Sequence, residues 1–186
     1  MHDLDFSPWN LPTDILEAVG LIATCSAQTE HVVQNGIAGC LGVDVEYGMA
    51  ITTHMTTPLR DHVLRAAAEI RIDSLDDLDE LDELLDEIEE AFKVRNAYIH
   101  NSLAMDKATG EVFSVKATAR GSVDVELLPV TVDKIKADAT RIYVAGLALY
   151  QFLQSRDLLA VTPPARPRGH KTSAARKKRR KALLKS

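Results

Sequence analysis

The spacing of apolar residues in the first forty positions predicts a long helix. Apolar and small side chains recur at steps of three or four residues, at Ile15, Val19, Ile22, Ser26, Thr29, Val33, Ile37 and Cys40. Thr13 is the expected N-cap after Pro12, and Gly42 supplies a stop signal. The mixture of apolar and small polar residues in this stripe predicts close packing against another helix, which Gly36 and Gly39 would allow.

Two shorter helices are expected next. The residues around Val45–Met55 indicate a short helical piece. Thr57-Pro58 then places a cap directly before a proline at the first helical position, a common helix start. The helix that it opens is expected to run to about Ile72.

The strongest amphipathic pattern follows Ser74. This serine and Asp77, three positions later, resemble a capping box. Leucine and other apolar residues then recur at helical spacing up to Phe92. Between Asp73 and Glu90 there are eleven Asp or Glu residues and no Lys or Arg. This acidic face is interpreted either as a solvated surface or as a docking surface for a basic partner.

The pattern changes to strand-like alternation after Lys107–Gly110. Apolar residues occupy about every second position over 112–127, on both sides of Arg120-Gly121, which predicts a small β-hairpin. Thr131 then opens a final helix that ends near Asp157. The expected fold is an all-α bundle of about five helices with a β-hairpin inserted before the last helix.

Length and charge refine this picture. A chain of 186 residues suits one domain, expected at 13–158, with a flexible N-terminus at 1–12 and a disordered tail at 159–186. No apolar run reaches the ~20 residues of a membrane span, and the N-terminus does not resemble a secretory signal. A cytoplasmic protein without membrane contact is therefore expected.

The C-terminal tail has the opposite charge to the body. Residues 163–186 hold ten Lys or Arg and no acid, whereas 1–162 hold twelve basic and 27 acidic residues. A dense cationic run without aromatic residues would bind RNA phosphates through charge alone. It consists of Arg176, Lys177, Lys178, Arg179, Arg180 and Lys181. The other interpretation is a solvated tail that aids solubility or folds back on the acidic helix.

The chain offers little for metal or disulfide chemistry. Cys25 and Cys40 are 15 residues apart in one predicted helix, so their Cα atoms would lie about 22 Å apart, beyond disulfide reach. They are expected to be buried, reduced thiols. Neither His54 and His62 nor Glu30-His31 has the spacing of a known metal motif. No metal or cofactor is predicted.

The candidate chemistry lies at the end of the acidic helix, in the segment Arg95–His100. Arg95 falls where the apolar stripe becomes polar, after Phe92. On a helix Asn96 and His100 lie within about 40° of each other, whereas Arg95 and His100 lie about 140° apart. One helix therefore does not aim both charged groups at one atom, but a second copy related by a two-fold axis would complete such a site.

The sequence Arg95-Asn96-x-x-x-His100, late in a long helix of a small helical domain, resembles the signature of HEPN domains. That signature is an arginine, usually followed by a polar residue, with a histidine after four to six intervening positions. The looser resemblance covers about residues 13–157. In place of the glycine that many members have after the histidine, this chain has Asn101-Ser102-Leu103, which predicts that the helix extends by a turn.

The resemblance implies metal-independent RNA cleavage across a homodimer, of the toxin or phage-defence type, with an inhibitory, antitoxin-like protein as a further partner. His100 would be the general acid or base, Arg95 the phosphate ligand, and Asn96 would orient the phosphate or the ring. Glu30, on the first helix, is a candidate for holding Arg95, and the other interpretation is an exposed surface residue. The alternatives are a non-catalytic HEPN-like dimerisation or nucleotide- and RNA-binding module, and an unrelated helical protein in which Arg95 pairs with neighbouring acids.

Overall fold

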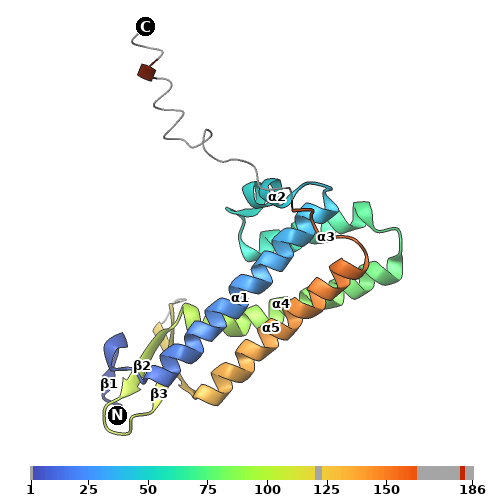
Figure 1. Ribbon diagram of the computed structural model, residues 1–186. Helices are drawn as coiled ribbons and strands as arrows, with labels where there is room; N and C mark the ends of the chain where they lie inside the picture. The colour runs from blue at the N-terminus through green and yellow to red at the C-terminus, as the bar shows by residue number, and fades with distance from the viewer. Residues whose placement is uncertain (1, 120–122, 163–180, 183–186) are drawn as a thin grey trace.

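The computed structural model describes residues 2–119, 123–162 and 181–182. The described residues form five α-helices and a four-stranded antiparallel sheet (Figure 1). The helices are α1 (Thr13–Cys40), α2 (Val45–Thr52), α3 (Thr57–Arg71), α4 (Leu75–Ile99) and α5 (Val132–Ser155). The strands are β1 (Leu4–Asp5), β2 (Ser102–Asp106), β3 (Val112–Ala119) and β4 (Val123–Val130), and a short 3-10 helix covers Pro8–Asn10.

The five predicted helices are confirmed, most closely where a side chain caps them. The Ser74 hydroxyl accepts a hydrogen bond from the backbone N–H of Asp77, and the Thr131 hydroxyl accepts one from Lys134. The prediction of Thr13 as a cap is wrong, because Pro12 is the N-cap residue and no side chain caps α1. After α1, Gly42 has a φ of 66°, a conformation that glycine adopts without strain.

α1 and α5 run in the same direction and make the most extensive contact between two helices of the described residues (Figure 1). α4 packs against α5. Small residues bring α1 and α5 together. A Cβ at Gly146 would overlap the Thr29 side chain, and the Thr29 hydroxyl donates to the Ile142 carbonyl at 3.2 Å. The core between the helices includes Ile22, Ile37, Leu64, Leu81, Leu85, Ile135, Ile142, Leu149 and Leu153, each 1% exposed or less.

The prediction of an all-α fold is wrong in one respect, since a sheet of four strands stands in place of a single hairpin. The predicted hairpin is β3 and β4, paired from Val112↔Val130 to Ala119↔Val123, while its turn at Arg120-Gly121 lies outside the described residues. β2 pairs with β3 on its other side, and β1 pairs with β2. The sheet lies at the end of the molecule where α4 finishes and where α1 and α5 begin (Figure 1).

The N-terminal residues, expected as a flexible lead, contribute to this sheet. Asp5 pairs with Met105, and Leu11 belongs to the buried core. His2 Nδ1 lies 2.6 Å from an Asp106 carboxylate oxygen, and its ring lies 5.2 Å from the Phe113 ring. The first twelve residues therefore include an edge strand and a core side chain, so a domain boundary at 13 leaves out residues that pack with the rest.

Both cysteines are buried and free, and burial raises the pKa of Cys40 to about 11. Gly39 makes a close contact, because a Cβ there would overlap the carbonyl oxygen of Leu158. Among the helices of the described residues, none is long and apolar enough to cross a membrane.

Candidate functional site: the Arg95 cleft

The C-terminal end of α4, with Arg95 to Ile99 and the C-cap residue His100, is held in place from two sides. The Tyr98 hydroxyl donates to an Asp138 carboxylate oxygen of α5 at 2.7 Å, and burial together with this contact raises the pKa of Tyr98. Ser114 of β3 donates from its hydroxyl to the Ala97 carbonyl at 3.0 Å. The segment is therefore fixed to both the bundle and the sheet.

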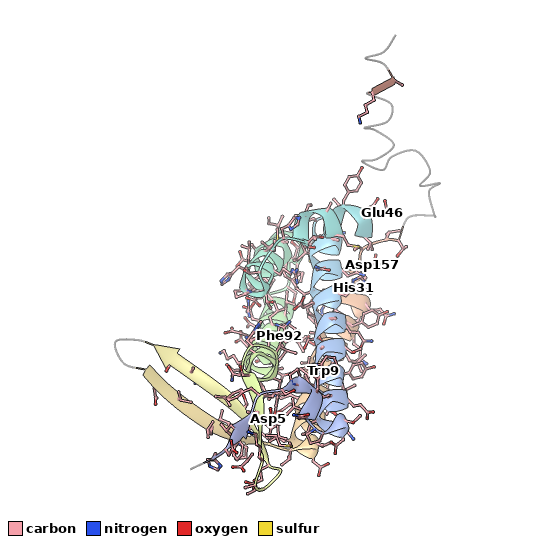
Figure 2. The ribbon with its side chains drawn as sticks, turned by 90° about the vertical axis from the view of Figure 1, so that its left-hand side faces the viewer. Asp5, Trp9, His31, Glu46, Phe92 and Asp157 are labelled. Carbon is pink, nitrogen blue, oxygen red and sulfur yellow. The ribbon has the colours of Figure 1, made fainter. Side chains whose placement is uncertain are left out.

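A cleft of about 350 Å³ lies next to this turn, between α1, α3 and α4. Figure 2 shows Phe92, one of its lining residues, on α4 between the α2–α3 end of the molecule and the sheet. The apolar lining residues are Val33, Pro58, Leu85, Ile88 and Phe92. The polar ones are Glu30, Thr57, Arg60, Asp61, His62, Glu89, Lys93, Arg95 and Asn96. The cleft thus combines apolar residues with convergent polar and charged groups, and such polar groups fix the orientation of a ligand in a binding site.

Two arginines share one carboxylate in the cleft. Arg60 of α3 is buried and donates from Nη1 to Glu30 Oε2 at 3.0 Å and from Nε to the Thr52 carbonyl at 3.2 Å. The other oxygen of Glu30, Oε1, lies 3.7 Å from Arg95 Nη2. Glu30 thus lies between the two guanidinium groups, and the expectation that it pairs with Arg95 is confirmed as a salt bridge.

The Arg95 guanidinium is less fully engaged than that of Arg60. Its Nη1 donates to Asn96 Oδ1 at 3.2 Å, its contact with Glu30 is longer than a hydrogen bond, and its Nε is buried with no hydrogen-bond partner. The group lies 5.8 Å from the centre of the Phe92 ring, within cation–π range. Four of the five N–H donors of an arginine are on its two Nη atoms, so Arg95 retains Nη donors for a ligand in the cleft even though its Nε is buried.

His100 lies outside this cleft. α4 ends at Ile99 and His100 is its exposed C-cap residue, whose backbone N–H donates to the Asn96 carbonyl at 3.0 Å. The expected extra helical turn is wrong, because Asn101 donates instead to the Ser114 hydroxyl and β2 begins at Ser102. A single chain therefore brings Arg95 and Asn96 into one cleft and leaves His100 beside it, in keeping with the 140° separation.

The acidic surface of α4 is partly neutralised within the fold. Arg65 of α3 contacts Asp82 and Asp86, and Arg156 after α5 contacts Asp77 and Glu80. These contacts attach α4 to its neighbours and leave the partner-docking interpretation open. Of the cationic tail run, only Lys181 is among the described residues, and it is exposed. The remaining positions, 176–180, lie outside them.

Arg60 was not identified from the sequence, although the spacing of buried positions in α3 includes it. Arg60 stands at the head of the buried stripe that continues through Leu64, Ala67 and Ala68. A guanidinium at a core position requires a buried acceptor, and Glu30 on α1 provides it. The sequence raises His62 only as a possible metal ligand, whereas the structure places it in the lining of the cleft. The described residues contain no group of three or more His, Cys, Asp or Glu side chains that would hold a metal ion.

Comparison with known proteins adds no assignment. No family model, curated protein or solved structure matches the chain. The resemblance to HEPN domains therefore depends on Arg95, Asn96 and His100 and on their helical setting, and the functional argument depends on the cleft itself.

Proposed function

We propose that the protein is a metal-independent endoribonuclease whose active site is completed in a homodimer. The observation that carries the proposal is the Arg95 guanidinium, which lines a cleft, contacts Glu30 and Asn96, and retains Nη donors. Such a group suits a phosphodiester, because a guanidinium contacts two phosphate oxygens at once and stabilises the charge that develops on them.

RNA suits this site because its 2′-OH is an internal nucleophile, so the reaction requires proton transfer and charge stabilisation at the phosphate. His100 is exposed and follows the cleft residue Asn96 by one helical turn, and an imidazole titrates in the range that general acid–base catalysis uses. We assign His100 as a proton-transfer group for the cleft of a second copy, Arg95 as the phosphate ligand, and Asn96 as the residue that orients either of them.

The outer surface of α1 supports the second copy. From Ala18 to Cys40 this helix has one charged residue, Glu30, which faces the cleft, and α5 has none over 142–155. Leu21 of α1 and Tyr143, Val144, Leu147 and Tyr150 of α5 are nevertheless exposed in these two stretches. Depletion of charge among exposed apolar residues is typical of an interface core. We therefore propose this surface as the contact with a second copy.

The remaining parts of the proposal concern biological setting. A toxin or phage-defence ribonuclease in the cytoplasm would need an inhibitory, antitoxin-like protein, and the basic tail would add RNA contacts through charge.

The test is cleavage of single-stranded RNA in EDTA by the wild type and by His100→Ala, with His54→Ala as the matched control. His54 is also an exposed histidine, but it is not one of the cleft residues. We expect His100→Ala to lose roughly 100-fold or more of the rate, the range for loss of a general acid or base, and His54→Ala to cleave normally. If the wild type cleaves no RNA, or if His100→Ala cleaves RNA as fast as the wild type, the proposed ribonuclease function is excluded.

One observation favours a second candidate, a non-catalytic HEPN-like module that binds nucleotide or RNA. In the single chain His100 does not line the cleft that contains Arg95 and Asn96. Such a module would bind RNA with an affinity that falls on Arg95→Ala and not on His100→Ala, and it would leave the RNA intact.

A further inference from the structure

The cleft contains a histidine of its own. His62 of α3 lines the same cleft as Arg95 and Asn96 of α4, and its side chain is 77% exposed. A phosphodiester held at Arg95 would therefore lie within one small cleft of the His62 ring.

The chemistry of RNA cleavage requires two proton transfers on opposite sides of the phosphorus. As the 2′-oxygen attacks, its proton must be taken up and the O2′–P bond forms. As the P–O5′ bond breaks on the far side, the leaving oxygen must gain a proton. The products are a 2′,3′-cyclic phosphate and a 5′-hydroxyl, so atoms and charge balance without a further reactant. One imidazole is badly placed to serve both oxygens at the same moment.

The other ionisable side chains of the cleft are already paired. Glu30 holds the two arginines, Asp61 accepts from Arg65 Nε at 3.0 Å, and Glu89 lies 3.1 Å from Lys93 Nζ. Lys93 also contacts Glu90, and its two carboxylate partners raise its pKa. The nearest recorded charged contact of His62 is long, 3.9 Å from Nδ1 to an Asp61 oxygen that Arg65 already occupies.

We propose that His62 is the second proton-transfer residue of the active site, acting in the cleft of its own chain together with Arg95. His100 of the second copy would serve the other oxygen. This inference rests on the ribonuclease proposed above. It places Arg95 and His62 on one chain and gives the reaction an acid and a base on different elements. The charged groups around His62 are Arg60 and Asp61 on α3, Glu30 on α1, and Glu89, Lys93 and Arg95 on α4.

The experiment measures single-turnover cleavage of an RNA oligonucleotide in EDTA from pH 5 to pH 9. The variants are His62→Ala, His62→Gln and His100→Ala, with His54→Ala as the control. Because the His62 side chain is largely exposed, the variants should fold, which thermal melting checks. We expect both His62 variants to lose roughly 100-fold or more of the rate and one limb of the bell-shaped pH profile, while His54→Ala keeps the rate and both limbs.

The outcomes separate this inference from the function on which it rests. If the wild type does not cleave, both are lost. If the wild type cleaves and His100→Ala does not, but the His62 variants keep the rate, the ribonuclease stands and the role of His62 is excluded. A His62 variant that is slow but keeps both limbs of the profile also excludes proton transfer, since binding or packing alone would then account for the loss.

Discussion

Gly39 tests, at the scale of one residue, how closely α1 approaches the segment after α5. A Cβ at this position would overlap the Leu158 carbonyl oxygen and approach the backbone of Leu159, and backbone atoms do not give way easily. We expect Gly39→Ala to lower the free energy of unfolding by about 1–3 kcal/mol, the usual cost of overpacking, as measured by urea denaturation.

Gly20 is the matched control on the same helix. A Cβ there would meet nothing within 4 Å, so alanine should favour the helix, with a gain of about 0.5–1 kcal/mol. Equal effects of the two substitutions would contradict the close approach at Gly39.

Asp106 links the N-terminus to the turn that follows β2. Hydrogen bonds from His2 and from the backbone N–H groups of Ala108 and Thr109 hold the pKa of Asp106 below its usual value. A carboxylate with a lowered folded-state pKa stabilises the fold above the unfolded pKa of about 3.9, and this contribution disappears as the pH falls through the folded-state pKa.

Asp106→Asn should therefore lower the urea midpoint at pH 7, and its difference from the wild type should shrink as the pH falls below about 4. Asp3→Asn is the control, because that carboxylate is 72% exposed and contacts only Lys107 among the recorded ion pairs. A difference that stayed constant from pH 7 to pH 3 would show that Asp106 acts without its charge.

At the scale of elements, Glu30 connects three helices through the two arginines of the cleft. Arg60 is held by the Thr52 carbonyl at the end of α2, and it in turn holds Glu30, whose other oxygen contacts Arg95. The position of Arg95 therefore depends on Glu30. Glu30→Gln should leave Arg95 less well oriented and lower the rate of RNA cleavage by roughly tenfold to 100-fold, as expected for a misplaced phosphate ligand.

Glu17→Gln is the control for this prediction, since Glu17 is an exposed carboxylate of the same helix and is not one of the cleft residues. The Glu30→Gln variant should still fold, with a lower melting temperature, because Arg60 loses its charged partner. Cleavage at the wild-type rate would mean that Asn96 alone orients Arg95.

The helices were predictable because their signals are local. Ser74 and Thr131 bind the first turns of their own helices, and apolar residues at helical spacing need only one face to be buried. The strand β2 was not predictable in this way. Its five residues show no clear alternation, and they are extended because β1 and β3 pair with them on both sides.

The site shows the same division between local and tertiary information. Arg95, Asn96 and His100 are close in sequence, so a motif identifies them. The cleft, in contrast, is assembled from α1, α3 and α4, and the carboxylate between Arg60 and Arg95 is 30 residues from one and 65 from the other along the chain. A single sequence does not show which charged residues, distant along the chain, contact each other in the fold. An arginine in an apolar stripe indicates only that some acceptor must pair with it.

At the scale of the whole molecule, the decisive question is whether Arg95 and His100 act in one site from two chains. Mixing Arg95→Ala with His100→Ala distinguishes the possibilities, because each variant alone lacks one group in every site. In a mixed dimer, one site receives Arg95 from one chain and His100 from the other and is intact, while the second site lacks both. With random exchange, half of the dimers are mixed, so about one quarter of the wild-type activity should return.

A second mixture, of Arg95→Ala with His62→Ala, separates the roles of the two histidines. If His62 acts on the cleft of its own chain, this mixture should recover no activity. In a mixed dimer the cleft of one chain lacks Arg95 and the cleft of the other lacks His62, so neither site is complete. Recovery in the first mixture and none in the second would place Arg95 and His62 on one chain and His100 on the other. Recovery in neither, with both variants shown to exchange subunits, would confine the chemistry to a single chain and remove the reason for a dimer.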